Sequence, residues 1–344
     1  MEFSAEQIAE FLQGKVEGNK KVIVNKVCKI EEGEQGAISF LANIKYVPFI
    51  YETKASIVII NNEFILERKT NATLIRVKDA YSSFASLLKL YNRYRFNRTG
   101  ISSLAFINDS VTLQENCYIG EYSVLDKGVK VGKNTRIYPQ VYIGDNTIIG
   151  DNVIIYPGVK IYHDVVIGDN CIIHSGAVIG ADGFGFAPLD DGSLKKIEQI
   201  GNVIIEENVE IGANTCVDRS TIGSTVIHRG VKIDNLCQIA HNVSVGNSTV
   251  MSAQTGLAGS TQLGKNCFVG GQVGFAGHIK IGDRVQVGAQ SGVMTDVQDD
   301  AQLLGSPAFP PKEWMRSYVC FKRLPDLEKK VRELENKLRT KADN

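Results

Sequence analysis

The feature that most constrains this sequence is an apolar residue at every sixth position. The period runs through residues 107–179, returns at 205–217 and continues through 227–293. Glycine often follows the apolar residue, as in Ile119-Gly120. A fixed period this short is typical of a parallel β-helix. In that fold each six residues supply a short strand and a turn, and three such units close one triangular coil of about 18 residues.

The apolar residue of each unit is expected to point inward and to stack on its equivalents in neighbouring coils, roughly 4.8 Å away. Glycine, asparagine and aspartate at the corners suit tight backbone angles. Four cysteines lie two positions before a periodic residue, and we expect them to be small buried core residues rather than disulfide or metal ligands: Cys117, Cys171, Cys237 and Cys267. Unpaired cysteines predict a reducing, cytoplasmic compartment.

The chain is expected to have three parts. Residues 1–100 lack the period and predict a small α/β domain, in which Ser4 and Gln7 form a capping box that opens a helix. Strands are expected at 22–24, 37–41, 56–60 and 73–77, and helices at 45–52 and 81–91. Residues 101–305 are the predicted β-helix, and residues 306–344 a helical extension.

The C-terminal part predicts a helix over 312–339 with a short heptad seam, formed by Leu324, Leu327, Val331, Leu334 and Leu338. The seam packs either on its own subunit or on copies of itself, and a symmetric oligomer is favoured because a regular solenoid offers few grooves. The 38 basic and 38 acidic residues balance, which gives no argument for nucleic-acid binding. Neither a secretory leader nor a membrane span is expected.

Two insertions interrupt the period. One begins with the glycine-aromatic segment 181–188, and the other places four extra residues between Val217 and Ile227. An insertion of this kind is either a tolerated surface loop or the wall of a pocket.

Of the five histidines, His163, His174 and His228 are expected to be surface or corner residues without chemistry. His241 lies two positions after a periodic residue, which places it at a coil corner. Three further residues belong to the candidate site around it, namely Asp234, Gly259 and His278.

Gly259 follows His241 by 18 residues and is therefore expected directly below it, with its N–H free to stabilise an oxyanion. His278 lies roughly two coils from His241 on nearly the same edge. Asp234 lies one face away and is expected to orient the imidazole. A base, an oxyanion donor and an orienting carboxylate suit acyl transfer from a thioester.

Seven short segments resemble those of the UDP-3-O-(3-hydroxyacyl)glucosamine N-acyltransferase family of lipid A biosynthesis: 179–186, 196–197, 199–201, 209–213, 218–219, 233–235 and 238–243. The resemblance covers all three parts of the chain. It implies a left-handed β-helix, a homotrimer with active sites between subunits, and no metal. It also implies transfer of a 3-hydroxyacyl chain from the phosphopantetheine arm of acyl carrier protein to the 2-amino group of UDP-3-O-acylglucosamine. At most peripheral proximity to the inner membrane is expected.

The family's site residues carry over by matching sequence. His241 matches the general base with Asp234 as its partner, Gly259 the oxyanion donor, and His278 a residue that assists near the carrier arm. In the first domain Phe40 and Tyr46 would sandwich the uracil and Asn43 would contact the nucleotide. Ordinary core packing is the alternative for these aromatic residues. Basic residues of the C-terminal helix are expected to contact the acidic carrier protein: Lys312, Arg316, Lys322 and Arg323.

Small residues at 288–292 predict room for a hydroxyacyl chain longer than fourteen carbons, because bulkier side chains occupy this place in some members of the family. Three other functions remain open. One is a UDP-N-acetylglucosamine O-acyltransferase or a sugar-nucleotide N-acetyltransferase that uses acetyl-CoA. Another is a carbonic-anhydrase-like zinc enzyme, which would need three histidines at one ion. The last is a scaffold without catalytic activity.

Overall fold

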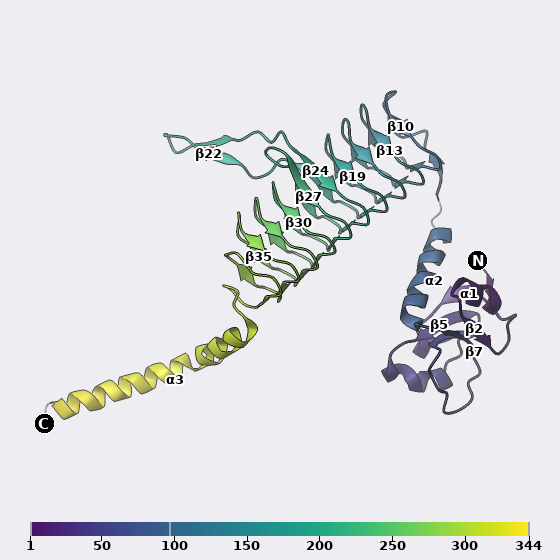
Figure 1. Cartoon of the computed structure of the whole chain (residues 1–344), viewed down its shortest axis with the longest axis horizontal. Coiled ribbons are helices and arrows are strands. Elements are labelled where there is room, and N and C mark those ends of the chain that lie inside the picture. The colour runs from purple at the N-terminus through teal and green to yellow at the C-terminus, as the bar shows by residue number, and fades with distance from the viewer. Residues whose placement is uncertain (1, 96–97, 343–344) are drawn as a thin grey trace. The chain divides into compact units, whose positions relative to one another are not determined.

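A computed structural model describes residues 2–95 and 98–342. The chain divides into two compact units, Met1–Asn97 and Arg98–Asn344. The first unit is an α/β domain, and the second contains a stack of parallel β-coils followed by one long helix (Figure 1).

The first unit is built on a five-stranded sheet in the order β2-β7-β6-β5-β4. The strands are β2 (Lys15–Glu17), β4 (Lys26–Val27), β5 (Ala37–Leu41), β6 (Ile57–Asn61) and β7 (Thr73–Val77), all parallel except β2. A short pair, β1 (Phe3–Ser4) and β3 (Ile23–Val24), is antiparallel. Apolar residues run without alternation along β6 because both faces of the sheet are covered.

Helices α1 (Ala5–Phe11) and α2 (Ala80–Arg95) pack with alternate residues of the central strands, including Ile57 and Ile59. The residues between them, Val58 and Ile60, pack with the 3₁₀ helices η1 (Ile30–Glu32) and η2 (Ile44–Tyr51). The predicted capping box is confirmed: the Ser4 hydroxyl accepts from the Gln7 N–H, and the Gln7 side chain accepts from the Ser4 N–H.

The predicted β-helix is confirmed as the core of the second unit. Three sheets of short parallel strands, most of them two residues long, form its faces. The nine-stranded sheet runs from β10 (Thr112–Leu113) to β36 (Lys280–Ile281), and the ten-stranded sheet from β9 (Phe106–Ile107) to β38 (Gly292–Val293). The eleven-stranded sheet runs from β8 (Gly100–Ile101) to β39 (Gln302–Leu303).

The periodic residues form one continuous core, in which Ile137 pairs with Ile155 and both are fully buried. The four cysteines expected in this core are buried and unpaired. At the same corner position Thr135 and Thr249 donate from their hydroxyls to carbonyls of the next coil, at 2.8 Å each. The corners need positive φ, as at Asn134 (φ 56°), because the chain turns there within one residue.

The two insertions change the spacing between paired residues without breaking the stack. Aligned positions in neighbouring coils are 18 residues apart, as Lys133 and Asp151 are. Across the first insertion Ile167 pairs with Ile205, and across the second Ile205 pairs with Ile227. The first insertion forms the hairpin β22 (Phe186–Pro188) and β23 (Leu194–Lys196), which stands out from the stack of coils (Figure 1). Its apolar side chains Phe184 and Leu194 are exposed.

The C-terminal helix α3 (Pro311–Ala342) covers the predicted helix and extends beyond it at both ends. The heptad seam is exposed in the single chain, which disagrees with the alternative that it packs on its own subunit. Packing on copies of itself, which the sequence favours, stays a prediction. Trp314 lies near Phe309, with ring centroids 6.1 Å apart. Among the described residues, no helix is both long and apolar enough to cross a bilayer.

Two of the small residues at 288–292 are in contact with the segment that follows the last coil. A Cβ on Gly288 would lie 2.5 Å from Cδ1 of Leu304, and one on Gly292 would lie 2.8 Å from the Ser306 hydroxyl. These glycines therefore admit the segment that ends the β-helix. The preference for a hydroxyacyl chain longer than fourteen carbons concerns the groove between subunits and stays a prediction.

Candidate active site

His241 lies between two glycines from different parts of the β-helix. A Cβ on Gly259 would lie 2.6 Å from both Cε1 and Nε2 of the imidazole, so the ring rests on the backbone of the next coil. A Cβ on Gly183 would lie 2.6 Å from Cβ of His241. Gly183 belongs to the first insertion, which therefore forms a wall beside the histidine. Any side chain at either position would have to displace the ring.

Asn242 determines which imidazole nitrogen carries the proton. The Thr221 N–H donates to Oδ1 of Asn242 at 3.2 Å, and Nδ2 of Asn242 donates to the Ile222 carbonyl at 3.1 Å and to the Ser220 hydroxyl. These contacts orient the amide so that Oδ1 faces Nδ1 of His241, 3.0 Å away. Because Oδ1 can only accept, Nδ1 must carry a hydrogen. Nε2 then keeps its lone pair, as a general base requires.

Gly259 has the free backbone donor that the sequence predicted at this corner. No described residue accepts a hydrogen bond from its N–H, whereas its carbonyl accepts from the His278 N–H at 3.0 Å. The Ser260 N–H in turn donates to the His241 carbonyl at 2.9 Å. His241, Gly259 and His278 therefore belong to one corner column. His278 occupies the left-handed turn position itself, with φ 62°.

Asp234 is not joined to His241 within one chain. Its Oδ1 accepts from the Asn235 N–H at 2.7 Å and its Oδ2 from the Ala253 N–H at 3.1 Å, so backbone groups at its own corner use both oxygens. It lines a polar hollow with His174 and Lys232. Asn242 takes the orienting position that the sequence assigned to Asp234, and a role for Asp234 in the assembled protein stays a prediction.

A buried arginine attaches the first insertion to the coils. The side chain of Arg219 is 1 % exposed. Its Nε donates to the Gly180 carbonyl at 2.7 Å, its Nη2 to the His163 carbonyl at 3.1 Å and its Nη1 to Nε2 of His163 at 2.9 Å. Asp182, which precedes the glycine beside His241, lies 4.0 Å from Nε of Arg219 and pairs with Lys196.

The three histidines expected to lack chemistry all have structural partners. His163 receives the hydrogen bond from Arg219, so its Nδ1 carries a hydrogen and donates to Oδ2 of Asp164 at 2.7 Å. This hydrogen bond lowers the pKa of Asp164. His174 stacks on Tyr156 with ring centroids 5.1 Å apart. Nδ1 of His228 is hydrogen-bonded to Oε1 of Glu206 at 3.0 Å.

The residues predicted to bind uridine lie on η2 and on the strand before it. Phe84 of α2 covers one face of the Phe40 ring, at a centroid distance of 4.1 Å. Oδ1 of Asn43 accepts from the Lys45 N–H and caps η2. Tyr46 is partly exposed near Phe49. A base can therefore stack on Phe40 only from the face opposite Phe84.

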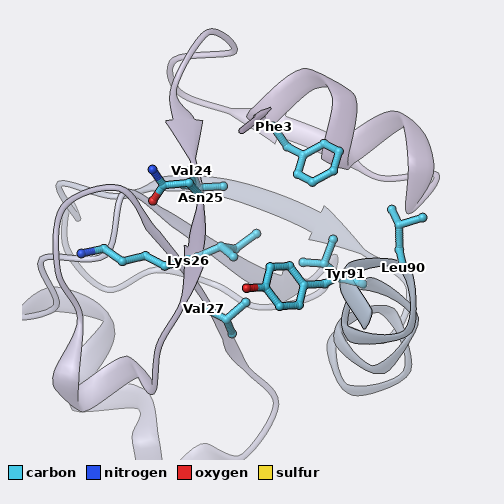
Figure 2. Close-up of a pocket in the computed structure, with 9 residues that line it drawn as sticks. Phe3, Val24, Asn25, Lys26, Val27, Leu90 and Tyr91 are labelled. Carbon is cyan, nitrogen blue, oxygen red and sulfur yellow. The ribbon is translucent and has the colours of Figure 1, made fainter. Parts of the chain in front are cut away.

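An apolar recess in the first unit lies elsewhere. It is lined by Phe3, Val24, Val27, Leu90 and Tyr91, among others, between β3 and α2 (Figure 2). Phe40, Asn43 and Tyr46 do not line it. Among the residues whose side chains the structure describes, no three of histidine, cysteine, aspartate or glutamate are placed to hold a metal ion.

Three residues around His241 were not identified from the sequence as parts of its site: Gly183, Asn242 and Asp218. Asn242 follows the histidine directly, so its position was the available signal. Gly183 and Asp218 depend on the path of the insertions, which the periodic pattern does not describe.

Comparison with known proteins connects this geometry to a family. Residues 21–90 match the family model described as UDP-3-O-(3-hydroxymyristoyl) glucosamine N-acyltransferase, LpxD. Residues 110–145 and 146–181 match the bacterial transferase hexapeptide model, and residues 261–289 match the hexapeptide repeat of succinyl-transferase.

Relatives named UDP-3-O-acylglucosamine N-acyltransferase match almost the whole chain. The protein of Christiangramia forsetii is 55% identical over 98% of this chain and 99% of its own length. That of Bacteroides thetaiotaomicron is 55% identical over 98% and 97%, and that of Porphyromonas gingivalis 52% identical over the same shares.

Among solved structures, Arabidopsis UDP-N-acetylglucosamine acyltransferase aligns with a TM-score of 0.56 at 23% identity, over 61% of this chain and 73% of that one. This likeness supports the left-handed β-helix fold alone. Identity of more than half along nearly the full length is the stronger finding, because it includes the first unit, both insertions and the His241 corner. The chain is an acyltransferase that belongs to the UDP-3-O-acylglucosamine N-acyltransferase family.

Proposed function

We propose that this protein transfers a 3-hydroxyacyl chain from acyl carrier protein to the 2-amino group of UDP-3-O-(3-hydroxyacyl)glucosamine and so forms UDP-2,3-diacylglucosamine in lipid A biosynthesis. One observation carries the proposal. The imidazole of His241 has its Nδ1 hydrogen held by Asn242, and its ring rests on Gly259, whose N–H is unused within the described chain. A base and an oxyanion donor are therefore adjacent, as acyl transfer requires.

The reaction is a direct attack without a covalent enzyme intermediate. Nε2 of His241 takes a proton from the acceptor amine as its nitrogen forms a bond to the thioester carbonyl carbon. The Gly259 N–H stabilises the oxyanion of the tetrahedral intermediate. The carbon–sulfur bond then breaks, the carbonyl re-forms as an amide, and the imidazolium gives its proton to the departing phosphopantetheine thiol.

The first unit supplies the proposed nucleotide site. Tyr46 and Phe40 would hold the uracil by stacking, and Asn43 would contact the nucleotide through the amide nitrogen that the η2 cap leaves free. The exposed basic residues of α3, including Lys312 and Arg316, suit an acidic carrier protein. The exposed heptad seam favours a homotrimer.

A turnover assay with 3-hydroxyacyl-carrier protein and UDP-3-O-acylglucosamine tests the proposal. We expect His241→Ala to lower kcat about 1,000-fold, within the range that general acid–base catalysis contributes. His228→Ala is the matched control, because it removes an imidazole from the same β-helix at a site held by Glu206. Circular dichroism and the oligomeric state should be those of the wild type in both variants.

Two results would overturn the proposal. Wild-type turnover by His241→Ala would exclude a base at this corner. Efficient turnover with acetyl-CoA, or with UDP-N-acetylglucosamine as the acceptor, would assign a different donor or a hydroxyl nucleophile.

A further inference from the structure

Asp218 is a nearly buried carboxylate at the edge of the candidate site. The end of β26 (Cys216–Asp218) lies between two coils: Asp218 pairs with Ala181 of β21 (Val178–Ala181) on one side, and Val217 pairs with Ile239 of β29 (Gln238–Ile239) on the other. Continuing the second register places Asp218 beside Ala240, one residue before His241. The Asp218 residue is 8 % exposed.

The segment after Asp218 is bonded to the residue after His241. The Thr221 N–H donates to Oδ1 of Asn242, and Nδ2 of Asn242 donates to Ser220. The chain from 218 to 221 therefore runs along the His241 corner, where hydrogen bonds with the Asn242 side chain hold it. On the other side, Asp182 precedes the glycine that touches His241.

Only one of the two carboxylate oxygens of Asp218 accepts a hydrogen bond from a described residue. Nε2 of Gln238 donates to its Oδ2 at 2.8 Å, and no described residue donates to its Oδ1. Oδ1 is therefore free to face a positive charge that forms nearby, and such a charge favours the ionised carboxylate. The proposed reaction creates such a charge, because His241 becomes an imidazolium when it takes the proton.

We propose that Asp218 is a positioning residue for His241 and that its carboxylate stabilises the imidazolium that forms during acyl transfer. The inference rests on the proposed function, since it needs His241 to act as the base. Asp218 acts through the histidine, and no contact with the substrate is required.

The charges around Asp218 agree with this role. Burial raises the pKa of Asp218 to about 6, the Gln238 hydrogen bond and the charge of His241 lower it, and Asp182 raises it. The neighbouring cations already have other partners. Lys196 forms an ion pair with Asp182, and Arg219 donates hydrogen bonds to Gly180 and His163. On the same strand, burial and the charge of Asp218 raise the pKa of Cys216. At neutral pH Asp218 is therefore ionised, and the carboxylate is present when the imidazolium forms.

Asp218→Asn removes the charge and keeps an oxygen for Gln238. We expect kcat to fall about 10- to 100-fold, which is the usual loss when a residue that supports a functional side chain is replaced. The acceptor KM should change less than about threefold, and the acid limb of the kcat/KM profile should move to lower pH, because no carboxylate favours the imidazolium. Asp190→Asn, at an exposed position of the same insertion, is the matched control and should leave the profile unchanged.

Gln238→Leu should move the acid limb of the kcat/KM profile in the opposite direction. This test does not depend on whether Asp218→Asn folds. Without its hydrogen bond the pKa of Asp218 rises, so the reactive state is lost at a higher pH and the acid limb moves up. Unchanged kcat and an unchanged profile in Asp218→Asn would overturn the inference. A raised acceptor KM with an unchanged profile would also overturn it, because the carboxylate would then bind substrate directly.

A measurement without substrate separates this inference from the proposed function. In ¹³C-aspartate NMR of the full chain, His241→Gln should raise the pKa of Asp218 further, since the positive charge that lowers it is gone. An unmoved Asp218 titration would refute the coupling even where His241 is essential for turnover. A moved titration together with wild-type turnover by His241→Ala would refute the proposed function instead.

Discussion

The imidazole of His241 lies directly on the backbone of Gly259, at a distance that leaves no room for a Cβ. The two residues belong to neighbouring coils, so the parallel stacking of strands fixes their separation. This contact unites the base and the oxyanion donor in one rigid corner.

Gly259→Ala should therefore damage the site more than the fold. The new Cβ would lie 2.6 Å from two imidazole atoms, so the ring must move, and a displacement near 1 Å costs about 100-fold in rate. Steady-state kinetics and thermal unfolding check this. Gly256→Ala is the control on the same coil, because a Cβ there meets no atom within 4 Å. Equal kcat values for the two variants would contradict the geometry.

Asn242→Gly should lower kcat about 10- to 100-fold by releasing the Nδ1 hydrogen of His241. Glycine tolerates the positive φ of 61° at this position, so the backbone is not strained by the change. Asn242→Asp keeps an oxygen facing Nδ1 and should retain more activity than Asn242→Gly. The reverse order of kcat values would show that the amide does not select the tautomer.

Arg219→Met should lower the free energy of unfolding by about 3 kcal/mol, because it leaves the buried hydrogen-bond partners of the guanidinium without a donor. It should also expose the segment 182–200 to limited proteolysis, since Arg219 holds Gly180 and lies beside Asp182. Arg229→Met is the control: its side chain is 63% exposed and its ion pair with Glu207 is 3.8 Å long. A similar loss in both variants would argue against the anchoring role.

Tyr46→Ala should raise the KM for the UDP-linked acceptor about tenfold or more, because stacking of one base on an aromatic ring contributes about 1–3 kcal/mol. The donor KM and the melting temperature should stay close to the wild type, since Tyr46 is partly exposed. Ile65→Ala removes another exposed apolar side chain of the first unit and should leave both KM values unchanged. An unaltered acceptor KM in Tyr46→Ala would remove this residue from the nucleotide site.

Local sequence predicted the elements of the first unit well where a capping box or a run of apolar residues marked them. The capping box at Ser4 and the strands 37–41 and 73–77 have the expected bounds. The segment 45–52 was expected to be helical and forms the 3₁₀ helix η2, which contains Pro48. The strand β2 was missed because Lys15–Glu17 is short and polar and pairs at the edge of the sheet.

The sequence by itself determined the β-helix, because a six-residue period places an apolar side chain inside every strand, and neighbouring coils then repeat at a fixed interval. The same interval placed Gly259 beneath His241. The tertiary structure decided what surrounds the ring. Gly183, Asn242 and Asp218 meet at His241 because two insertions shift the pairing to 38 and 22 residues, and no periodic rule describes the path of an inserted segment. It also separated Asp234 from His241, because backbone N–H groups at its own corner hold that carboxylate.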